Sequence, residues 1–216
     1  MNSIQKEKFA ITIGRESGSA GRVIGMMVAD KLGIRCYDDQ LIAVASDISG
    51  FSETVISHHE EKTKKSFLYS LVTGSYGADR YGAGTANSMP MEQKVFLAEY
   101  NAIKEIYGRE NAVFVGRCSD YALQDSPGLI SIFVKAKLPD RIAHVMETYV
   151  FDEEKAKDFV KSTDKARKNY YEFYTGRKWG GSHYDLIIDR SPVGIEGAAN
   201  TIVNYVKEKL FFSSEN

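Results

Sequence analysis

The sequence predicts an α/β protein with a five-strand parallel sheet and helices on both of its faces. Short, continuously apolar runs alternate with longer segments of helical periodicity along most of the chain. The apolar runs lack the polar alternation of a sheet with one wet face, so they are typical of strands covered on both sides. A length of 216 residues suits one such domain with an inserted segment.

The first part of the chain predicts two strands and three helices. Residues 9–13 form the expected first strand, and apolar residues at helical spacing then continue to Gly33, which ends that helix. Residues 34–37 (IRCY) are a short second strand. Residues 41–49 form a short helix, and Ser52 is suited to cap the start of another.

The segment 58–91 has a different character. A charged run is followed by the glycine-rich stretch GSYGADRYGAGTANSMPM, residues 74–91, in which no hydrophobic periodicity is present. Irregular segments of this length inside a compact domain are usually lids, binding loops or disordered. We therefore expect a mobile insertion here.

The second part of the chain returns to the alternation of helix and strand. Residues 92–107 have a helical pattern, and Pro139 with Asp140 suits the first turn of another helix. Asp152 is expected to begin a long helix that ends at Gly176. The remaining expected elements are strands at 111–116, 129–136 and 184–189 and a final helix that carries Ile195, Ala199, Ile202, Val206 and Leu210 on one stripe.

Composition narrows the class of partner. The formal net charge is −1 and charged residues make up 26%, so no overall basic field indicates a nucleic-acid polymer or an anionic membrane. A small phosphorylated ligand needs only a local group of arginines. The N-terminus lacks the apolar core of a signal peptide, and Cys36 and Cys118 suit reduced thiols, so we expect a cytoplasmic protein.

The stretch AITIGRESGSAGR, residues 10–22, combines a strand, a glycine-rich turn and a helix start. Glycines let backbone N–H groups turn toward anionic oxygens, and the helix N-terminus favours negative charge. Arg22 supplies a cation. The spacing differs from G-x-x-x-x-G-K-[ST], because Arg22 and Val23 stand where lysine and a hydroxyl residue are usual. A phosphate loop and an ordinary glycine turn both fit this stretch.

A dinucleotide loop is the third interpretation. Gly14, Gly18 and the acid Asp38 loosely match the spacing of a nicotinamide-binding turn. A dehydrogenase would also need a hydride-transfer site, and the glycines with Asp38 do not supply one. Arginines follow later strands and a late helix instead, and convergent arginines are what phosphoryl transfer requires. They are Arg117, Arg141, Arg167 (with Asp164 on the same helix face) and Arg177.

Taken in order, the stretches ITIGRESGSAGR, CYDDQLI, VFVGRCSDYAL, SIFVKAKLPDRI, DKARKNYYEFYTGRKWG and YDLIIDRSPVGIEGAANTI resemble the cytidylate kinase-like family. The resemblance covers about residues 9–207 and implies a P-loop NTPase fold with three layers. It also implies one kinase-like domain over 1–216, in which 58–91 is an acceptor-binding, lid-like insertion and 152–183 is a lid region.

The same resemblance implies roles for particular residues. The donor ATP phosphates would lie on Ser17, Gly18, Ser19, Ala20, Gly21 and Arg22. The acceptor would be bound by Asp38, Arg117, Asp164 and Arg167, with Arg22, Arg117 and Arg167 as the catalytic set. Asp38 would also act indirectly on Mg²⁺, and Arg141 and Arg177 would belong to the lid.

The function implied is ATP- and Mg²⁺-dependent phosphoryl transfer to a nucleoside monophosphate, with CMP or dCMP as the acceptor named by the family. Nucleotides are then the expected partners. Because Arg22 and Val23 depart from the usual loop, a kinase fold that binds a nucleotide without turnover is the alternative. An NAD(P)-dependent oxidoreductase, supported by the glycines and Asp38 alone, is the third.

Overall fold

The computed structural model describes residues 8–38, 40–50, 52–54 and 90–214. The insertion expected at 58–91 lies outside these residues except for its last two positions. The chain divides into two compact units, one made of Met1–Asp38 with Ile103–Asn216 and the other of Asp39–Ala102.

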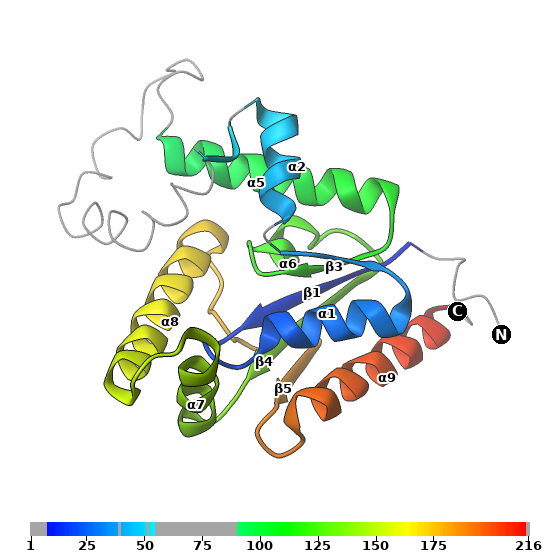
Figure 1. Cartoon of the computed structure of the whole chain (residues 1–216). Coiled ribbons are helices and arrows are strands. Elements are labelled where there is room, and N and C mark those ends of the chain that lie inside the picture. Colours follow the sequence, from blue (N-terminus) through cyan, green and yellow to red (C-terminus); the bar gives the residue numbers. More distant parts are fainter. Residues whose placement is uncertain (1–7, 39, 51, 55–89, 215–216) are drawn as a thin grey trace. The chain divides into compact units, whose positions relative to one another are not determined.

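The first unit contains a five-strand sheet in the order β2-β3-β1-β4-β5, and all four strand pairs are parallel. This confirms the predicted sheet (Figure 1). The central strand β1 lies between β3 and β4, with Ile11 opposite Val113 on one side and Ile130 on the other. In the common dinucleotide-binding order β1 would instead neighbour β2. The strands are β1 Ala10–Arg15, β2 Arg35–Tyr37, β3 Ala112–Val115, β4 Leu129–Lys135 and β5 Leu186–Asp189.

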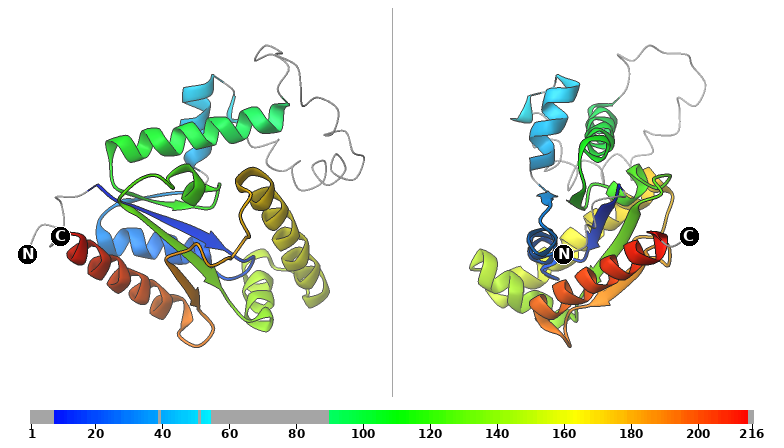
Figure 2. Two further views of the ribbon diagram at one scale, coloured as in Figure 1. Left: turned by 180° about the vertical axis from the view of Figure 1, so that it is seen from behind. Right: turned by 90° about the vertical axis from the view of Figure 1, so that its right-hand side faces the viewer.

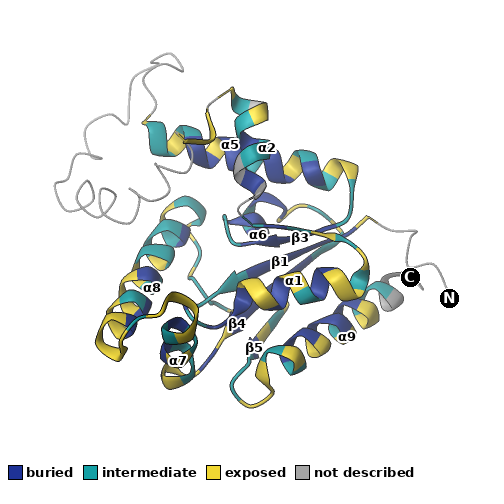
Figure 3. Ribbon diagram, in the orientation of Figure 1, coloured by how far each residue is buried: buried dark blue, intermediate teal, exposed yellow. Residues whose placement is uncertain are grey.

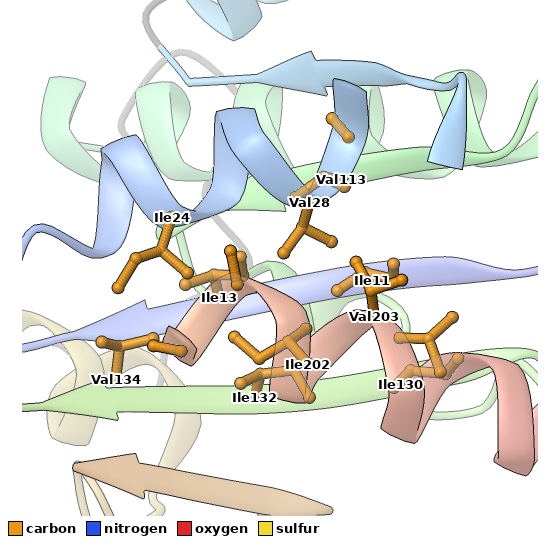
Figure 4. Close-up of a cluster of buried hydrophobic side chains, with 14 of the residues drawn as sticks. Ile11, Ile13, Ile24, Val28, Val113, Ile130, Ile132, Val134, Ile202 and Val203 are labelled. Carbon is orange, nitrogen blue, oxygen red and sulfur yellow. The ribbon is translucent and has the colours of Figure 1, made fainter. Parts of the chain in front are cut away.

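Helices cover both faces of the sheet, as predicted. Helices α1 (Gly21–Leu32) and α9 (Gly194–Ser214) lie on one face and contact each other. The short helix α6 (Ser119–Ala122) contacts β1 from the opposite face (Figure 2). The main core lies between the sheet and helices α1 and α9, and Figure 4 shows it. Its fully buried members include Ile11, Ile13, Ile24, Val28, Val113, Ile132, Val134 and Ile202.

Helices α7 (Leu138–Tyr149) and α8 (Glu153–Thr175) pack on each other through a small apolar cluster of their own. Asp152 caps α8 as predicted, because its carboxylate accepts a hydrogen bond from the Lys155 N–H at 2.8 Å. Gly176 ends the helix at a φ of 66°. Burial along both helices follows the faces that meet (Figure 3). The cluster consists of Ile142, Val145, Ala156 and Val160.

The second unit contains α2 (Gln40–Ser49) and the beginning of α5 (Met91–Arg109), whose end belongs to the first unit. Both helices match the predicted segments. Of the helix expected after Ser52, only residues 53–54 are described, and they are helical. Among the described helices, none has the length and apolar content needed to cross a membrane.

Strand β5 begins two residues later than the sequence predicts. The reason lies at Asp185, which meets Ser131 of β4 through side-chain groups: the Asp185 N–H donates to the Ser131 hydroxyl at 3.1 Å. Its Oδ2 accepts the Ser131 N–H at 2.7 Å and the Ser131 hydroxyl at 3.0 Å. A side-chain bond of this kind replaces the ladder bond that a strand residue would make.

Candidate functional site

The loop between β1 and α1 is folded by its own backbone. The Glu16 N–H bonds to the Val134 carbonyl at 3.0 Å, and the Glu16 carbonyl accepts the Ser19 N–H at 3.3 Å and its hydroxyl at 2.8 Å. Ala20 then takes a left-handed φ of 60°, and the first helical bond runs from the Ile24 N–H to the Ala20 carbonyl. The N–H groups of the first α1 turn therefore face the loop, as in sites that bind anions.

Arg190, the residue after β5, holds the outer side of this loop. Its Nε donates to the Ser19 carbonyl at 3.1 Å, and its Nη2 donates to the Gly18 carbonyl at 3.2 Å and the Asp140 carbonyl at 3.0 Å. Gly18 lies so close to α7 that a Cβ built there would be 2.4 Å from the Arg141 carbonyl oxygen. Sequence reasoning did not assign Arg190 to the site; its position after the last strand was the only signal.

Arg141 is part of the loop's support. Its Nη1 is ion-paired with Asp164 Oδ2 on α8, and its Nε lies 3.6 Å from the Glu16 carboxylate. The other oxygen of Asp164 accepts the Ser17 N–H at 2.6 Å. The side chain of Arg141 is only 11% exposed, so the structure places this expected lid arginine inside a network that joins α7, α8 and the loop.

Asp38, at the end of β2, gathers two arginines. The Arg22 Nε lies 2.9 Å from Oδ2, and the Arg15 Nη2 lies 3.9 Å from Oδ1. Arg15 fits there because Gly116 has no side chain: a Cβ at Gly116 would lie 1.7 Å from the Arg15 Nη1. The sequence predicted Arg22 and Asp38 for this site but gave no sign of Arg15, which is the last residue of a buried strand.

Arg167 lies next to this group. Its Nη1 is 3.5 Å from the Arg15 carbonyl. Burial, followed by the positive charge of Arg15, lowers the pKa of Arg167 to about 9, while Asp164 and Asp38 act in the opposite direction. A desolvated guanidinium beside a second one is stabilised by any anion that binds between them. The arrangement can therefore hold a phosphate.

Arg117 lies in a strained turn at the end of β3. Gly116, Arg117 and Cys118 all have positive φ, at 79°, 59° and 51°. A left-handed conformation costs a residue with a side chain about 1–2 kcal/mol, and such strain concentrates at functional sites. Arg177, in contrast, donates to Gln124 at 2.6 Å and lies over the Tyr121 ring, so its described contacts are with the α6 region rather than with the loop.

A buried polar network joins α6 to α8, and sequence reasoning missed it. Asp120 is 6% exposed, and burial raises its pKa. The Tyr171 hydroxyl donates to Asp120 and lies 2.7 Å from His183 Nε2. Tyr171 is buried, whereas Phe173, two residues later on α8, is 42% exposed.

Both cysteines are free thiols. Cys118 is buried, and burial raises the pKa of the half-buried Cys36 to about 11. A thiol with a raised pKa is a poor nucleophile and a poor metal ligand. Cys36 therefore adds no such chemistry to the loop.

A divalent ion would find few direct ligands here. Within the described part of the chain, no three His, Cys, Asp or Glu side chains gather in a way that suits a metal ion. The carboxylate of Asp38 is paired with two arginines, and Val23 offers no oxygen. The loop suits the phosphates of a nucleotide. A Mg²⁺ ion would be coordinated by those phosphates rather than by side chains of the protein.

The sheet order and the glycine-rich loop after the central strand define a protein of the P-loop kinase fold. More narrowly, the chain belongs to the cytidylate kinase-like family, whose model matches residues 10–192. The crystal structure of an uncharacterized protein from Eubacterium ventriosum is 26% identical, with a TM-score of 0.68 over 93% of this chain and 99% of that one. No curated protein matches the sequence.

A more distant likeness supports the fold alone. The crystal structure of shikimate kinase from Bacteroides thetaiotaomicron is 12% identical, with a TM-score of 0.51 over 92% of this chain and 98% of that chain.

Proposed function

We propose that the protein transfers the γ-phosphoryl group of ATP, bound with Mg²⁺, to a nucleoside monophosphate. CMP and dCMP are the acceptors that the family name suggests. The observation that carries the proposal is the meeting of the α1 N-terminus with Arg15, Arg22 and Arg167 around Asp38. Phosphoryl transfer is catalysed mostly by positioning and by neutralising charge, which such a group can do.

The donor phosphates would lie on the loop from Ser17 to Arg22. The N–H groups of Ala20 and Gly21 start α1 and would bind phosphate oxygens, while the Arg22 guanidinium would neutralise the phosphoryl group in transfer. Arg22 is well placed for this, since its side chain is 57% exposed although it pairs with Asp38. Asp38 would orient a water of the Mg²⁺ that the nucleotide brings.

The acceptor phosphate would be held by Arg117 and Arg167, with Arg15 beside them. Asp164 would accept a hydroxyl of the acceptor sugar with a lone pair that Ser17 and Arg141 leave available. An oxygen of the acceptor phosphate attacks the γ-phosphorus, and the bond from that phosphorus to the bridging oxygen breaks. The electron pair leaves with ADP. No general base is needed, because the acceptor phosphate is already ionised.

The lid roles remain proposals as well. The segment 58–91 would bind the acceptor. The segment 152–183 would close over the phosphates with its Arg177, together with Arg141 from the preceding helix α7. The described contacts support the part of Arg141, which already links α7 to the loop and to α8.

A coupled assay of ADP release tests the proposal. It would compare CMP, dCMP, UMP, AMP and GMP as acceptors, with ATP alone as the blank. We expect one or two pyrimidine acceptors to raise the rate well above the blank. Clear ATP binding without turnover on any acceptor would refute the kinase activity.

That last outcome would support the second candidate, a nucleotide-binding protein without turnover. Two observations favour it. The Asp164 carboxylate already takes the Ser17 N–H at the start of the loop, and Arg22 is followed by Val23 where a metal-binding hydroxyl is usual.

A further inference from the structure

The guanidinium of Arg190 donates hydrogen bonds to backbone carbonyl oxygens of the phosphate loop and of α7. It spans three carbonyl oxygens, those of Gly18, Ser19 and Asp140, at 3.2, 3.1 and 3.0 Å. The first two belong to consecutive residues at the tip of the loop, and the third belongs to the first turn of α7. One side chain from the end of β5 thus joins the loop to a helix.

The contact with the Ser19 carbonyl also determines which way the following N–H points, because the peptide between them is planar and trans. In such a peptide the C=O of one residue and the N–H of the next point in opposite directions. A Ser19 carbonyl that faces Arg190 therefore turns the Ala20 N–H away from Arg190. The Ser19 N–H is already bonded to the Glu16 carbonyl at 3.3 Å, so Ala20 is the first loop residue whose N–H this orientation makes available to a ligand.

The conformation that results is one a loop would not keep by itself. Ala20 has a φ of 60°, which costs a residue with a side chain about 1–2 kcal/mol. The contact of Gly18 with the Arg141 carbonyl fixes the same stretch from the α7 side. Backbone strain of this kind persists only where surrounding contacts hold it, and Arg190 supplies two of those contacts, to the Gly18 and Ser19 carbonyls.

We propose that Arg190 is a positioning residue that orients the loop peptides so that the Ala20 N–H group faces the nucleotide phosphates before these arrive. This inference rests on the proposed function in taking a nucleotide phosphate as the ligand. A guanidinium at the Ser19 carbonyl also polarises the peptide between Ser19 and Ala20, which makes the Ala20 N–H a stronger donor. Donors set in place beforehand need no reorganisation on binding.

The proposed role predicts a different effect of substitution for Arg190 than for Arg22 or for an arginine that only stabilises the fold. Arg190 touches no phosphate in this scheme, so its loss should weaken phosphate binding without removing a charge from the phosphates themselves. Replacing an arginine with a purely structural role would lower the free energy of unfolding and leave the ligand affinity of the folded protein unchanged.

The test uses Arg190→Gln and Arg190→Lys in the full chain, with Arg35→Gln as the matched control. Arg35 is an exposed arginine on β2 that pairs with Glu110. Isothermal titration would measure the Kd of MgATP and of pyrophosphate without any acceptor, and urea unfolding would measure stability without ligand. We expect Arg190→Gln to raise both Kd values about tenfold or more, because misplaced donors lose much of their effect.

Arg190→Lys keeps the charge but cannot span three carbonyls, so we expect an intermediate Kd. If Arg190→Gln does not fold, Arg190→Lys carries the test. If turnover is found, KM for ATP should rise while KM for the acceptor stays constant. Unchanged Kd values in folded variants, against tight binding by the wild type, would overturn the inference alone. No MgATP or pyrophosphate binding by the wild type would overturn the proposed function and this inference together.

Discussion

Asp164 on α8 accepts a hydrogen bond from the backbone N–H of Ser17, 147 residues earlier in the chain, at 2.6 Å. Its second oxygen is ion-paired with Arg141. One carboxylate thus joins α8, the preceding helix α7 and the Ser17 N–H of the loop. The side chains of Asp164 and Arg141 are 20% and 11% exposed, so this pair is shielded from water.

Asp164→Asn should lower the free energy of unfolding by about 2 kcal/mol. Removing one partner of a buried ion pair costs about 3–5 kcal/mol, and partial exposure reduces that figure. The amide keeps an acceptor for Ser17 but opposes the Arg141 guanidinium with its own NH₂ group. Urea unfolding of both proteins measures the difference.

Glu153→Gln is the control for that substitution. Glu153 pairs with Lys157 one turn away on the same helix, and its side chain is 63% exposed. An exposed pair of this kind contributes about 0.3–0.5 kcal/mol. If the two variants lost the same free energy of unfolding, the buried Asp164 network would contribute no more to stability than an exposed ion pair.

The parts of the fold that the sequence predicts well are those with local causes. Apolar runs mark the strands because β1, β3 and β4 are buried on both faces. Caps such as Asp152 and Gly176 mark helix ends because their contacts lie within a few residues. Ser17 to Arg22 likewise form one continuous segment. These signals need no knowledge of which segments meet in space.

The residues that sequence reasoning missed act over long separations. Arg190 bonds to the Ser19 carbonyl 171 residues earlier, and Arg15 requires a bare Gly116 in the turn after β3. A side chain that binds a distant backbone carbonyl leaves no pattern of spacing near itself. Asp120 is similar, since its partner Tyr171 lies on a different helix.

Gly116→Ala should weaken phosphate binding and lower stability. The new Cβ would lie 1.7 Å from the Arg15 Nη1, so Arg15 must leave its place near Asp38. The left-handed φ of 79° adds about 1–2 kcal/mol of strain. Titration with MgATP and with CMP would show raised Kd values for at least one ligand.

Gly33→Ala isolates the strain from the clash. Gly33 has a similar φ of 67°, but a Cβ there would meet no atom within 4 Å. We expect it to lose about 1 kcal/mol of stability and to bind both ligands like the wild type. Weakened binding in Gly33→Ala as well would mean that strain, rather than the place of Arg15, explains the first result.

His144 on α7 should make stability depend on pH. Burial, followed by the charge of Arg190, lowers its pKa in the folded state, and Glu147 acts in the opposite direction. A histidine with a lowered folded pKa adds stability that is present above its unfolded pKa, about 6.5, and is lost as pH falls below it. The free energy of unfolding should therefore fall between pH 7.5 and 5.5.

His144→Gln should flatten that part of the profile, because glutamine takes up no proton in either state. Urea unfolding at several pH values would compare the two slopes. Equal slopes would assign the pH dependence to another group, and a steeper fall in the variant would contradict the direction of the shift.

Arg22→Ala should lower kcat at least about tenfold, the low end for losing one group that stabilises charge in the transition state. Its stability should change by less than about 1 kcal/mol, because the Arg22 side chain is 57% exposed and its pair with Asp38 is open to solvent on one side. Arg109→Ala, which removes an exposed arginine paired with Glu105, is the control and should leave kcat unchanged. Steady-state kinetics with the best acceptor measure both variants. An unchanged kcat in Arg22→Ala would remove Arg22 from the mechanism and leave Arg15, Arg117 and Arg167 as the cations that act on the transferring phosphoryl group.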